Sequence, residues 1–268
     1  EATLDVITAG SDLERVVEVA AWLGINGFAG IELSSVAMDG IADLTVRARF
    51  PTGRKLTRSD VIVDTDIIIQ QGQLSKFPIF GNVSDVELVG QFSDSGTELS
   101  GTAILFGAPV DFVVTEDRLK DRLVFRANAP KAEGLATLMA STTGLDMKGS
   151  LGGNIMLVTG SALSDFEIEL GLDLADTSID IPAIGWAKLP AEPGSASMRL
   201  VLKDGVPLAI EDIDIEAGSL AMVGRAGFAA SKGNGVTISE ASFRRLGWPG
   251  NDIGICLLYT SPSPRDNR

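Results

Sequence analysis

Apolar and polar side chains alternate without a break from Asp165 to Leu174. Successive side chains of a β-strand point to opposite faces of the sheet, whereas a helical face repeats about every 3.6 residues. The pattern therefore predicts a strand with one apolar and one polar face. Its apolar side chains are Phe166, Ile168, Leu170, Leu172 and Leu174, and its polar ones are Asp165, Glu167, Glu169 and Asp173.

The same kind of pattern continues to residue 228 and predicts an antiparallel meander. A strand at 197–202 is followed by Asp204-Gly205, a pair typical of a tight hairpin turn. In the next strand the alternation shifts phase at Glu211-Asp212, which predicts a β-bulge that bends the sheet. A further strand is expected at 220–228. This segment has a one-sided apolar surface that needs a partner.

The first half of the chain begins with a short strand and a helix. Apolar residues recur at helical spacing from Leu13, and Ser11 with Glu14 matches a capping box at the helix start. We expect the helix to end at Gly24. Its polar face carries Glu14 and Glu18 instead of a basic cluster, which favours packing on a sheet over binding to a membrane.

Further strands and a second helix give the two halves of the chain the same plan. Alternating segments such as 61–69 continue to residue 129, separated by Gly and polar turns. A short helix is expected around Leu138 and should end at Gly144. Each half then consists of a strand, a short helix and a run of strands. We expect two units, 1–129 and 130–255, that share one continuous sheet.

The two ends of the chain carry no fold signal of this kind. Residues 256–268 have no apolar period and look like the translation of a DNA library adaptor, so we expect a non-native tail outside the fold. The chain opens at Glu1 without Met and without a signal-peptide pattern, which suggests an internal fragment of a longer protein.

Composition narrows the classes of partner. The formal net charge is -14 and the pI is about 4.4, so a nucleic-acid partner and adsorption to an anionic membrane are disfavoured. Aromatic residues make up only 6%, and the apolar faces are therefore aliphatic. No uncharged apolar run is long enough to span a bilayer.

Candidate catalytic chemistry is sparse, and we expect no enzyme, no cofactor and no metal. The chain has no His, and its single Cys lies in the tail, which removes the usual nucleophile–base pairs and zinc ligands. The Gly-rich stretch 149–153 precedes a strand, so it is interpreted as a turn and not as a phosphate loop. A glycosidase that uses two carboxylates is a distant alternative.

Two features have both a functional and a structural interpretation. Two acidic sets, Asp64 with Asp66, and Glu211, Asp212, Asp214 and Glu216, could supply oxygen ligands to calcium or paired carboxylates for glycoside cleavage. Carboxylates also keep a solvated strand face soluble, and the spacing of a calcium loop is absent. Trp186 could stack on a ligand, although a Trp at a corner bounded by Gly and Pro more often fills the end of a sheet. The structural interpretation is favoured for both.

The order of several short motifs resembles the AsmA-like proteins of the Gram-negative envelope, specifically the YhdP type. They are a Pro-x-x-Gly-Trp-x-Lys corner at 182–188, a Pro-Gly step at 193–194 into a strand, the segment 210–215 and a closing Gly-x-Asp at 250–252. The corner matches the family form only in part, and the resemblance covers most of 1–255.

The resemblance implies a periplasmic location, with an inner-membrane anchor upstream of this chain. It also implies a hydrophobic groove that carries phospholipid acyl chains between the inner and outer membranes. We therefore expect a mainly β fold, a long curved antiparallel meander that forms an open β-groove with two short helices. Periodicity alone fits a closed β-sandwich equally well, which would make the protein a structural envelope module without lipid.

The candidate lipid-binding residues are the apolar side chains of the predicted strands: Val61, Val63, Ile67, Ile69, Phe166, Ile168, Leu170, Leu172, Leu174, Met198, Leu200, Leu220 and Met222. Aliphatic side chains suit an acyl chain, which offers no directional polar contacts.

Overall fold

The fold is taken from a computed structural model of the whole chain. The structure describes residues 2–22, 27–28, 31–32, 37–52, 57, 60–77, 81–93, 95–105, 107–143, 145–160, 164–204, 206–231 and 235–258. Gly24, Gly144 and Gly205, at which two helix ends and a hairpin turn were expected, lie outside these residues.

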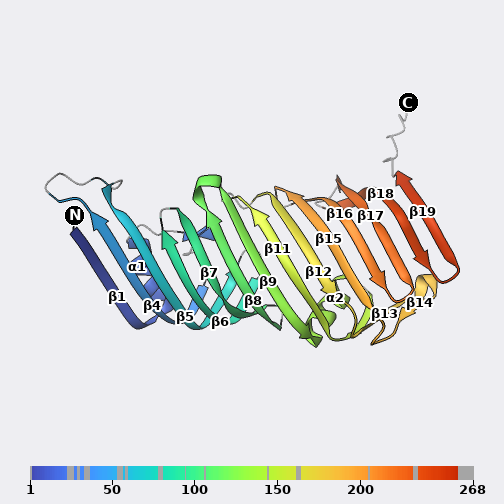
Figure 1. Cartoon of the computed structure of the whole chain (residues 1–268), viewed down its shortest axis with the longest axis horizontal. Helices are drawn as coiled ribbons and strands as arrows, with labels where there is room; N and C mark the ends of the chain where they lie inside the picture. The colour runs from blue at the N-terminus through green and yellow to red at the C-terminus, as the bar shows by residue number, and fades with distance from the viewer. Residues whose placement is uncertain are drawn as a thin grey trace, which may run out of the picture.

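One antiparallel sheet of fourteen strands forms most of the described structure, and the strands follow chain order from one edge to the other (Figure 1). The first and last strands of this sheet lie at opposite ends of the long axis (Figure 1). The strands are β1 (Ala2–Asp12), β4 (Ala37–Phe50), β5 (Ile62–Phe77), β6 (Gly81–Ser93), β7 (Gly96–Leu105), β8 (Ala108–Asp117), β9 (Arg122–Ala132), β11 (Leu151–Thr159), β12 (Phe166–Asp173), β15 (Gly194–Lys203), β16 (Val206–Ala217), β17 (Leu220–Ser231), β18 (Gly235–Trp248) and β19 (Asn251–Leu258).

The sheet has one apolar and one polar face, as the alternation predicts. Leu170 of β12 pairs with Ile155 of β11 and Met198 of β15, and directly paired residues share a face. The next residue, Glu169, pairs with Met156 and Arg199 on the other side. We call the first side the apolar face and the second the polar face. The expected mainly β meander with an open β-groove is confirmed.

Rows of β-bulges bend the sheet. Gly10, Gly40, Gln71 and Asp85 all have positive φ and lie at register shifts in the neighbouring strands β1, β4, β5 and β6. A bulge increases the local twist and re-aims a strand, so an aligned row folds the sheet along a line. Near the other end, Asp212 has φ 53° beside register shifts of β16 with both of its neighbours. The predicted bulge at Glu211-Asp212 is thus confirmed.

Two short helices pack on the apolar face. Helix α1 (Leu13–Trp22) follows β1, and its Leu13 and Val16 are buried with Leu44 and Val46 of β4. The expected cap was wrong in detail, because Asp12 and not Ser11 accepts the Glu14 amide, at 2.9 Å. Asp12 directly precedes the first helical residue, which is the position from which a short carboxylate reaches that amide.

Helix α2 (Glu133–Thr143) and a small sheet cover the apolar face near one end of the second-half strands. The small sheet has the order β10-β13-β14, with β10 at Asp146–Gly149, β13 at Thr177–Ile181 and β14 at Trp186–Lys188. The 3-10 turn Pro182–Ile184 joins its last two strands. A separate two-stranded hairpin contains β2 (Gly27–Phe28) and β3 (Ile31–Glu32), and a 3-10 turn at Arg118–Lys120 precedes β9.

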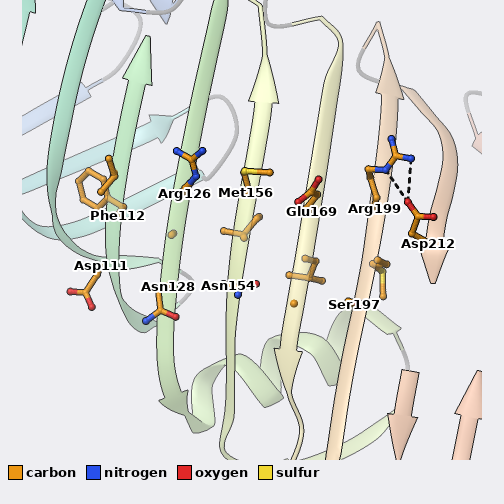
Figure 2. A pocket seen from close by; sticks show the side chains of 16 residues that line it. Asp111, Phe112, Arg126, Asn128, Asn154, Met156, Glu169, Ser197, Arg199 and Asp212 are labelled. Carbon is orange, nitrogen blue, oxygen red and sulfur yellow. Dashed lines mark hydrogen bonds and ion pairs between the residues drawn. The ribbon is translucent and has the colours of Figure 1, made fainter. Parts of the chain in front are cut away.

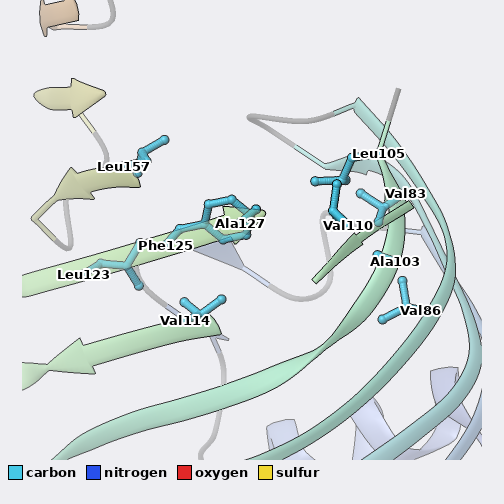
Figure 3. Packing of buried hydrophobic residues seen from close by; sticks show 10 residues of the cluster. All are labelled: Val83, Val86, Ala103, Leu105, Val110, Val114, Leu123, Phe125, Ala127 and Leu157. Carbon is cyan, nitrogen blue, oxygen red and sulfur yellow. The ribbon is translucent and has the colours of Figure 1, made fainter. Parts of the chain in front are cut away.

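The central part of the sheet has its own apolar cluster. Ten buried side chains from β6, β7, β8, β9 and β11 converge on the inner side of the curved strands (Figure 3). Phe112 and Phe125 stack at the edge of this cluster, with ring centroids 6.3 Å apart. The cluster comprises Val83, Val86, Ala103, Leu105, Val110, Val114, Leu123, Phe125, Ala127 and Leu157.

The two expected units are parts of the same sheet. Strand β9 spans the expected boundary at residue 129 and pairs with β8 on one side and β11 on the other. The prediction of one continuous sheet is confirmed, and a sandwich of two large sheets is not the arrangement of the described residues. Strand β19 runs to Leu258, which extends the sheet into the segment expected to lie outside the fold.

Candidate functional site

The apolar face of the sheet is the candidate site, and it is not equally accessible along its length. Each of the thirteen predicted lipid-binding residues is buried or half-buried, and none is fully exposed. They divide into four groups according to what covers them.

The N-terminal group packs under α1. Val63, Ile67 and Ile69 of β5 lie against the buried cluster that contains Leu13 of α1. Their register opposite Ala48, Leu44 and Ala42 of β4 fixes them on the apolar face. Val61 precedes β5 and is half-buried. The helix therefore covers much of this part of the face.

The central and distal groups also belong to packed clusters. Phe166 and Ile168 of β12 border the central cluster of ten residues. At the other end of the same strand, Leu172 borders a second cluster together with Leu220, and Leu174 is buried within that cluster at 4% exposure. Leu174 thus fills core beneath α2 and the small sheet, and it offers no surface to a ligand.

In the fourth group, Leu170, Met198 and Leu200 form what we call the open apolar strip, and Met222 lies apart from it, opposite Ile215 of β16. These side chains are half-buried and belong to none of the three clusters formed by the described residues. Leu170 pairs with Met198, and Leu200 pairs with Ile168 on one side and with Ile210 on the other. Ile210 extends the strip and was not predicted, because the phase shift at the following bulge obscures its face.

Trp186 and Lys188 anchor the small sheet that covers the second cluster. Trp186 is 3% exposed within the second cluster, and its Nε1 donates to Ser219 Oγ at 3.2 Å. The expectation that this Trp fills the end of the sheet is confirmed. Lys188 is 1% exposed, and its Nζ donates to the carbonyl oxygens of Ala175, Thr177 and Leu189 at 3.0–3.2 Å.

Burial lowers the pKa of Lys188 below its ordinary value, and the nearby carboxylates of Glu192, Asp176 and Asp173 oppose that shift. The three carbonyls satisfy the ammonium without a direct ion pair in the described contacts. Lys188 therefore holds the segments before and after β13 and β14 together, and its role is structural.

The polar face carries two shallow hollows that the sequence did not indicate. One, of about 860 Å³, crosses β8 to β16 and is bordered by Arg126, Glu169 and Arg199 (Figure 2). The guanidinium of Arg199 contacts Glu211 at 2.6 Å and Asp212 at 3.2 Å. A second hollow of about 710 Å³ adjoins it. A twisted sheet is hollowed on both of its faces along opposite diagonals, so strand alternation does not reveal such a site.

Four of the acidic residues considered as calcium ligands have protein partners. Asp64 binds Arg49 at 2.5 Å, Asp66 accepts from Gln91 at 3.0 Å, and both Glu211 and Asp212 bind Arg199. Across the part of the chain that the structure describes, no group of three or more His, Cys, Asp or Glu side chains is placed to hold a metal ion.

Comparison with known proteins adds no relative. Neither a family model, nor a curated protein, nor a solved structure matches the chain. Among the described helices, none has the length and apolar character needed to cross a membrane.

Proposed function

We propose that the chain is a segment of an AsmA-like, YhdP-type bridge protein that carries phospholipid acyl chains along its apolar groove in the periplasm. The open strip of Leu170, Met198 and Leu200 supports this proposal best, because these neighbouring apolar side chains lie on one sheet face outside the packed clusters. The motif order that resembles this family supports the same function and the location between two membranes.

The chemistry of the strip suits a hydrocarbon guest. An acyl chain gains binding energy from the apolar area it removes from water, and it needs no directional polar partner. Methionine side chains adapt to irregular partners because they are unbranched and polarizable. The groups that could compete by hydrogen bonding, Glu169 and Arg199, lie on the opposite face. A chain that moves along the strip would therefore encounter no strong local trap.

Site-specific photo-crosslinking tests the proposal with a control one residue away. A photoreactive amino acid at Met198 faces the open strip, whereas the same group at Ser197 lies on the polar face. We expect phospholipid adducts at position 198 and none at position 197 when the protein is isolated from cells that have a Gram-negative envelope. Native mass spectrometry of the unmodified protein should show a bound phospholipid mass.

Two results would count against lipid transport. The first is a clean unliganded mass from native spectrometry under conditions that preserve known lipid complexes. The second is equal adduct formation at positions 197 and 198, which would indicate non-specific contact with detergent or membrane.

The alternative is a structural envelope module without a lipid ligand. Its support is the extent to which α1, α2 and the small sheet already cover the apolar face, with Leu13 at 1% and Leu174 at 4% exposure. This function predicts no copurified lipid and no uptake of an apolar fluorescent dye. A dye titration of the purified chain therefore separates the two functions, because the open strip should bind dye if lipid is the natural guest.

A further inference from the structure

One margin of the apolar face is polar. A row of directly paired residues on this face runs across the sheet from Val6 in β1 to Leu202 in β15. The next row toward the helices runs from Leu44 to Leu200 and contains only Gly and apolar residues. We call the first row the polar margin, after its polar members Thr65, Thr97, Glu116 and Thr159.

Glu116 is the only charged residue in this row, and its side chain is 11% exposed. Its Oε2 accepts hydrogen bonds from Thr97 Oγ1 at 2.9 Å and from Arg118 Nε at 3.3 Å. Arg118 lies in the 3-10 turn between β8 and β9, and its Nη1 donates to the Ser93 carbonyl at 2.9 Å. These contacts fix a carboxylate and a guanidinium side by side at the edge of the apolar face.

The pair retains one unused acceptor and one unused donor. Among the contacts of the described residues, Glu116 Oε1 accepts no hydrogen bond and Arg118 Nη2 donates none. Both groups have capacity for further bonds, because a carboxylate accepts at two oxygens and a guanidinium carries five N–H donors. Charge-assisted hydrogen bonds of this kind are the strong ones, so the pair suits a ligand that carries an ammonium beside a phosphate.

The position of the pair suits a lipid whose tails lie on the apolar face. Helices α1 and α2 follow the opposite ends of β1 and β9, so the polar margin is the side away from them (Figure 1). Three strand spacings of about 4.8 Å separate β8 from β12, where the open strip begins. A phospholipid tail spans about 15 Å, half of the hydrocarbon core of a bilayer. A headgroup at Glu116 therefore leaves the tail within reach of Leu170.

We propose that Glu116 and Arg118 bind the zwitterionic headgroup of phosphatidylethanolamine. The ammonium donates to Glu116 Oε1, and the phosphate accepts from Arg118 Nη2. Phosphatidylglycerol has the same phosphate but no ammonium, so the site distinguishes the two lipids. This inference rests on the proposed lipid transport, and it adds the class of headgroup and the side of the groove on which the headgroup lies.

Lipid uptake from mixed vesicles tests the selection. The full chain is incubated with vesicles of equal phosphatidylethanolamine and phosphatidylglycerol content and separated from them, and its bound lipids are quantified by mass spectrometry. Wild type should hold phosphatidylethanolamine in about fivefold excess. Glu116→Gln keeps an oxygen for Thr97 but removes the charge, and it should bring the ratio close to that of the vesicles. The matched control Glu169→Gln, on the polar face, should leave the ratio unchanged.

A second pair of variants tests the phosphate contact. With diacylglycerol added to the vesicles, Arg118→Gln should lower both phospholipids about fivefold relative to diacylglycerol, which has the tails but no phosphate. Arg126→Gln, on the polar face, is the control and should change nothing. Circular dichroism shows whether each variant folds, and the ratio bound by wild type tests the selection even if Glu116→Gln does not.

Four results would overturn the proposal. Bound lipid with the composition of the vesicles would exclude headgroup selection and leave lipid transport standing. Equal shifts in Glu116→Gln and Glu169→Gln would place the selection elsewhere. Displacement of the lipid by an equal concentration of soluble glycerophosphoethanolamine would assign the site to a free headgroup compound. No bound lipid in wild type would overturn this site together with the proposed function.

Discussion

At the scale of single residues, Lys188 departs furthest from what its side chain predicts. A lysine in a short strand is normally a solvated residue, yet strand alternation places Lys188 on the same side as the buried Trp186. The surrounding glycines make room for it, since a Cβ at Gly194 would lie 2.7 Å from Lys188 Cε. The sequence shows the Gly-Trp-x-Lys order but not the three carbonyl partners, because these come together only in the folded loop.

Replacing this lysine should destabilise the fold. Lys188→Met keeps most of the side-chain volume but leaves the carbonyls of Ala175, Thr177 and Leu189 without their charged donor. Loss of these bonds should lower the free energy of unfolding by about 2 kcal/mol. This value allows for a partial offset, because the variant no longer buries a charged group. Urea denaturation measures this change. Lys148→Met in the same small sheet, where the ammonium is 76% exposed, is the control and should be nearly neutral.

The difference in unfolding free energy between wild type and Lys188→Met should depend on pH, and the sign of that dependence can be predicted. Because burial lowers the pKa of Lys188 from 10.5, the unfolded chain binds this proton more tightly than the folded chain. Between the lowered pKa and 10.5, rising pH therefore stabilises wild type relative to Lys188→Met, by up to about 1.4 kcal/mol per pH unit. Urea denaturation of both proteins at pH 7 and at pH 10 measures this effect. If the stability advantage of wild type over Lys188→Met became smaller at pH 10, burial would not be the cause of the lowered pKa.

At the scale of elements, the sequence predicts strands well and their coverage poorly. The alternation from Asp165 to Leu174 correctly assigns every apolar side chain of β12 to one face. A strict two-residue repeat of apolar side chains fits a β-strand and no other regular secondary structure. It does not separate the half-buried Leu170 from the buried Leu174, because that difference depends on the small sheet. Part of that sheet lies in the stretch 182–194, whose Pro and Gly residues indicate a loop.

The bulge row offers a test at this scale. Gly40 has φ 132°, and a Cβ there would lie 2.9 Å from Gly72 Cα in the neighbouring strand. Gly40→Ala should therefore lower the free energy of unfolding by about 2–3 kcal/mol through backbone strain and steric overlap. Gly107→Ala is the matched control, since φ is also positive at 77° but the added Cβ meets nothing within 4 Å. Its cost should be about 1 kcal/mol, and equal losses in thermal denaturation would show that crowding between strands is unimportant.

At the scale of the whole molecule, the fourteen strands form a nearly one-dimensional array. Each strand pairs with its neighbours in chain order, and the three apolar clusters occupy successive stretches of the sheet. Arrays of this kind gain stability from each unit and from its nearest neighbours, so distant parts need not unfold together. Strand β9, which spans the expected boundary at residue 129, is hydrogen-bonded to β8 and β11.

A core substitution at one end should therefore have a local effect. Val46→Ala removes two methyl groups from a side chain that is 2% exposed in the cluster under α1, which should destabilise that region by about 2 kcal/mol. Hydrogen exchange followed by mass spectrometry should then accelerate in β1, β4 and β5 and remain unchanged in β16 to β18. A uniform acceleration in all strands would mean that the sheet unfolds as one cooperative unit. In that case a guest bound at the open strip would stabilise the entire chain, whereas in a one-dimensional array it protects only the strands beside it.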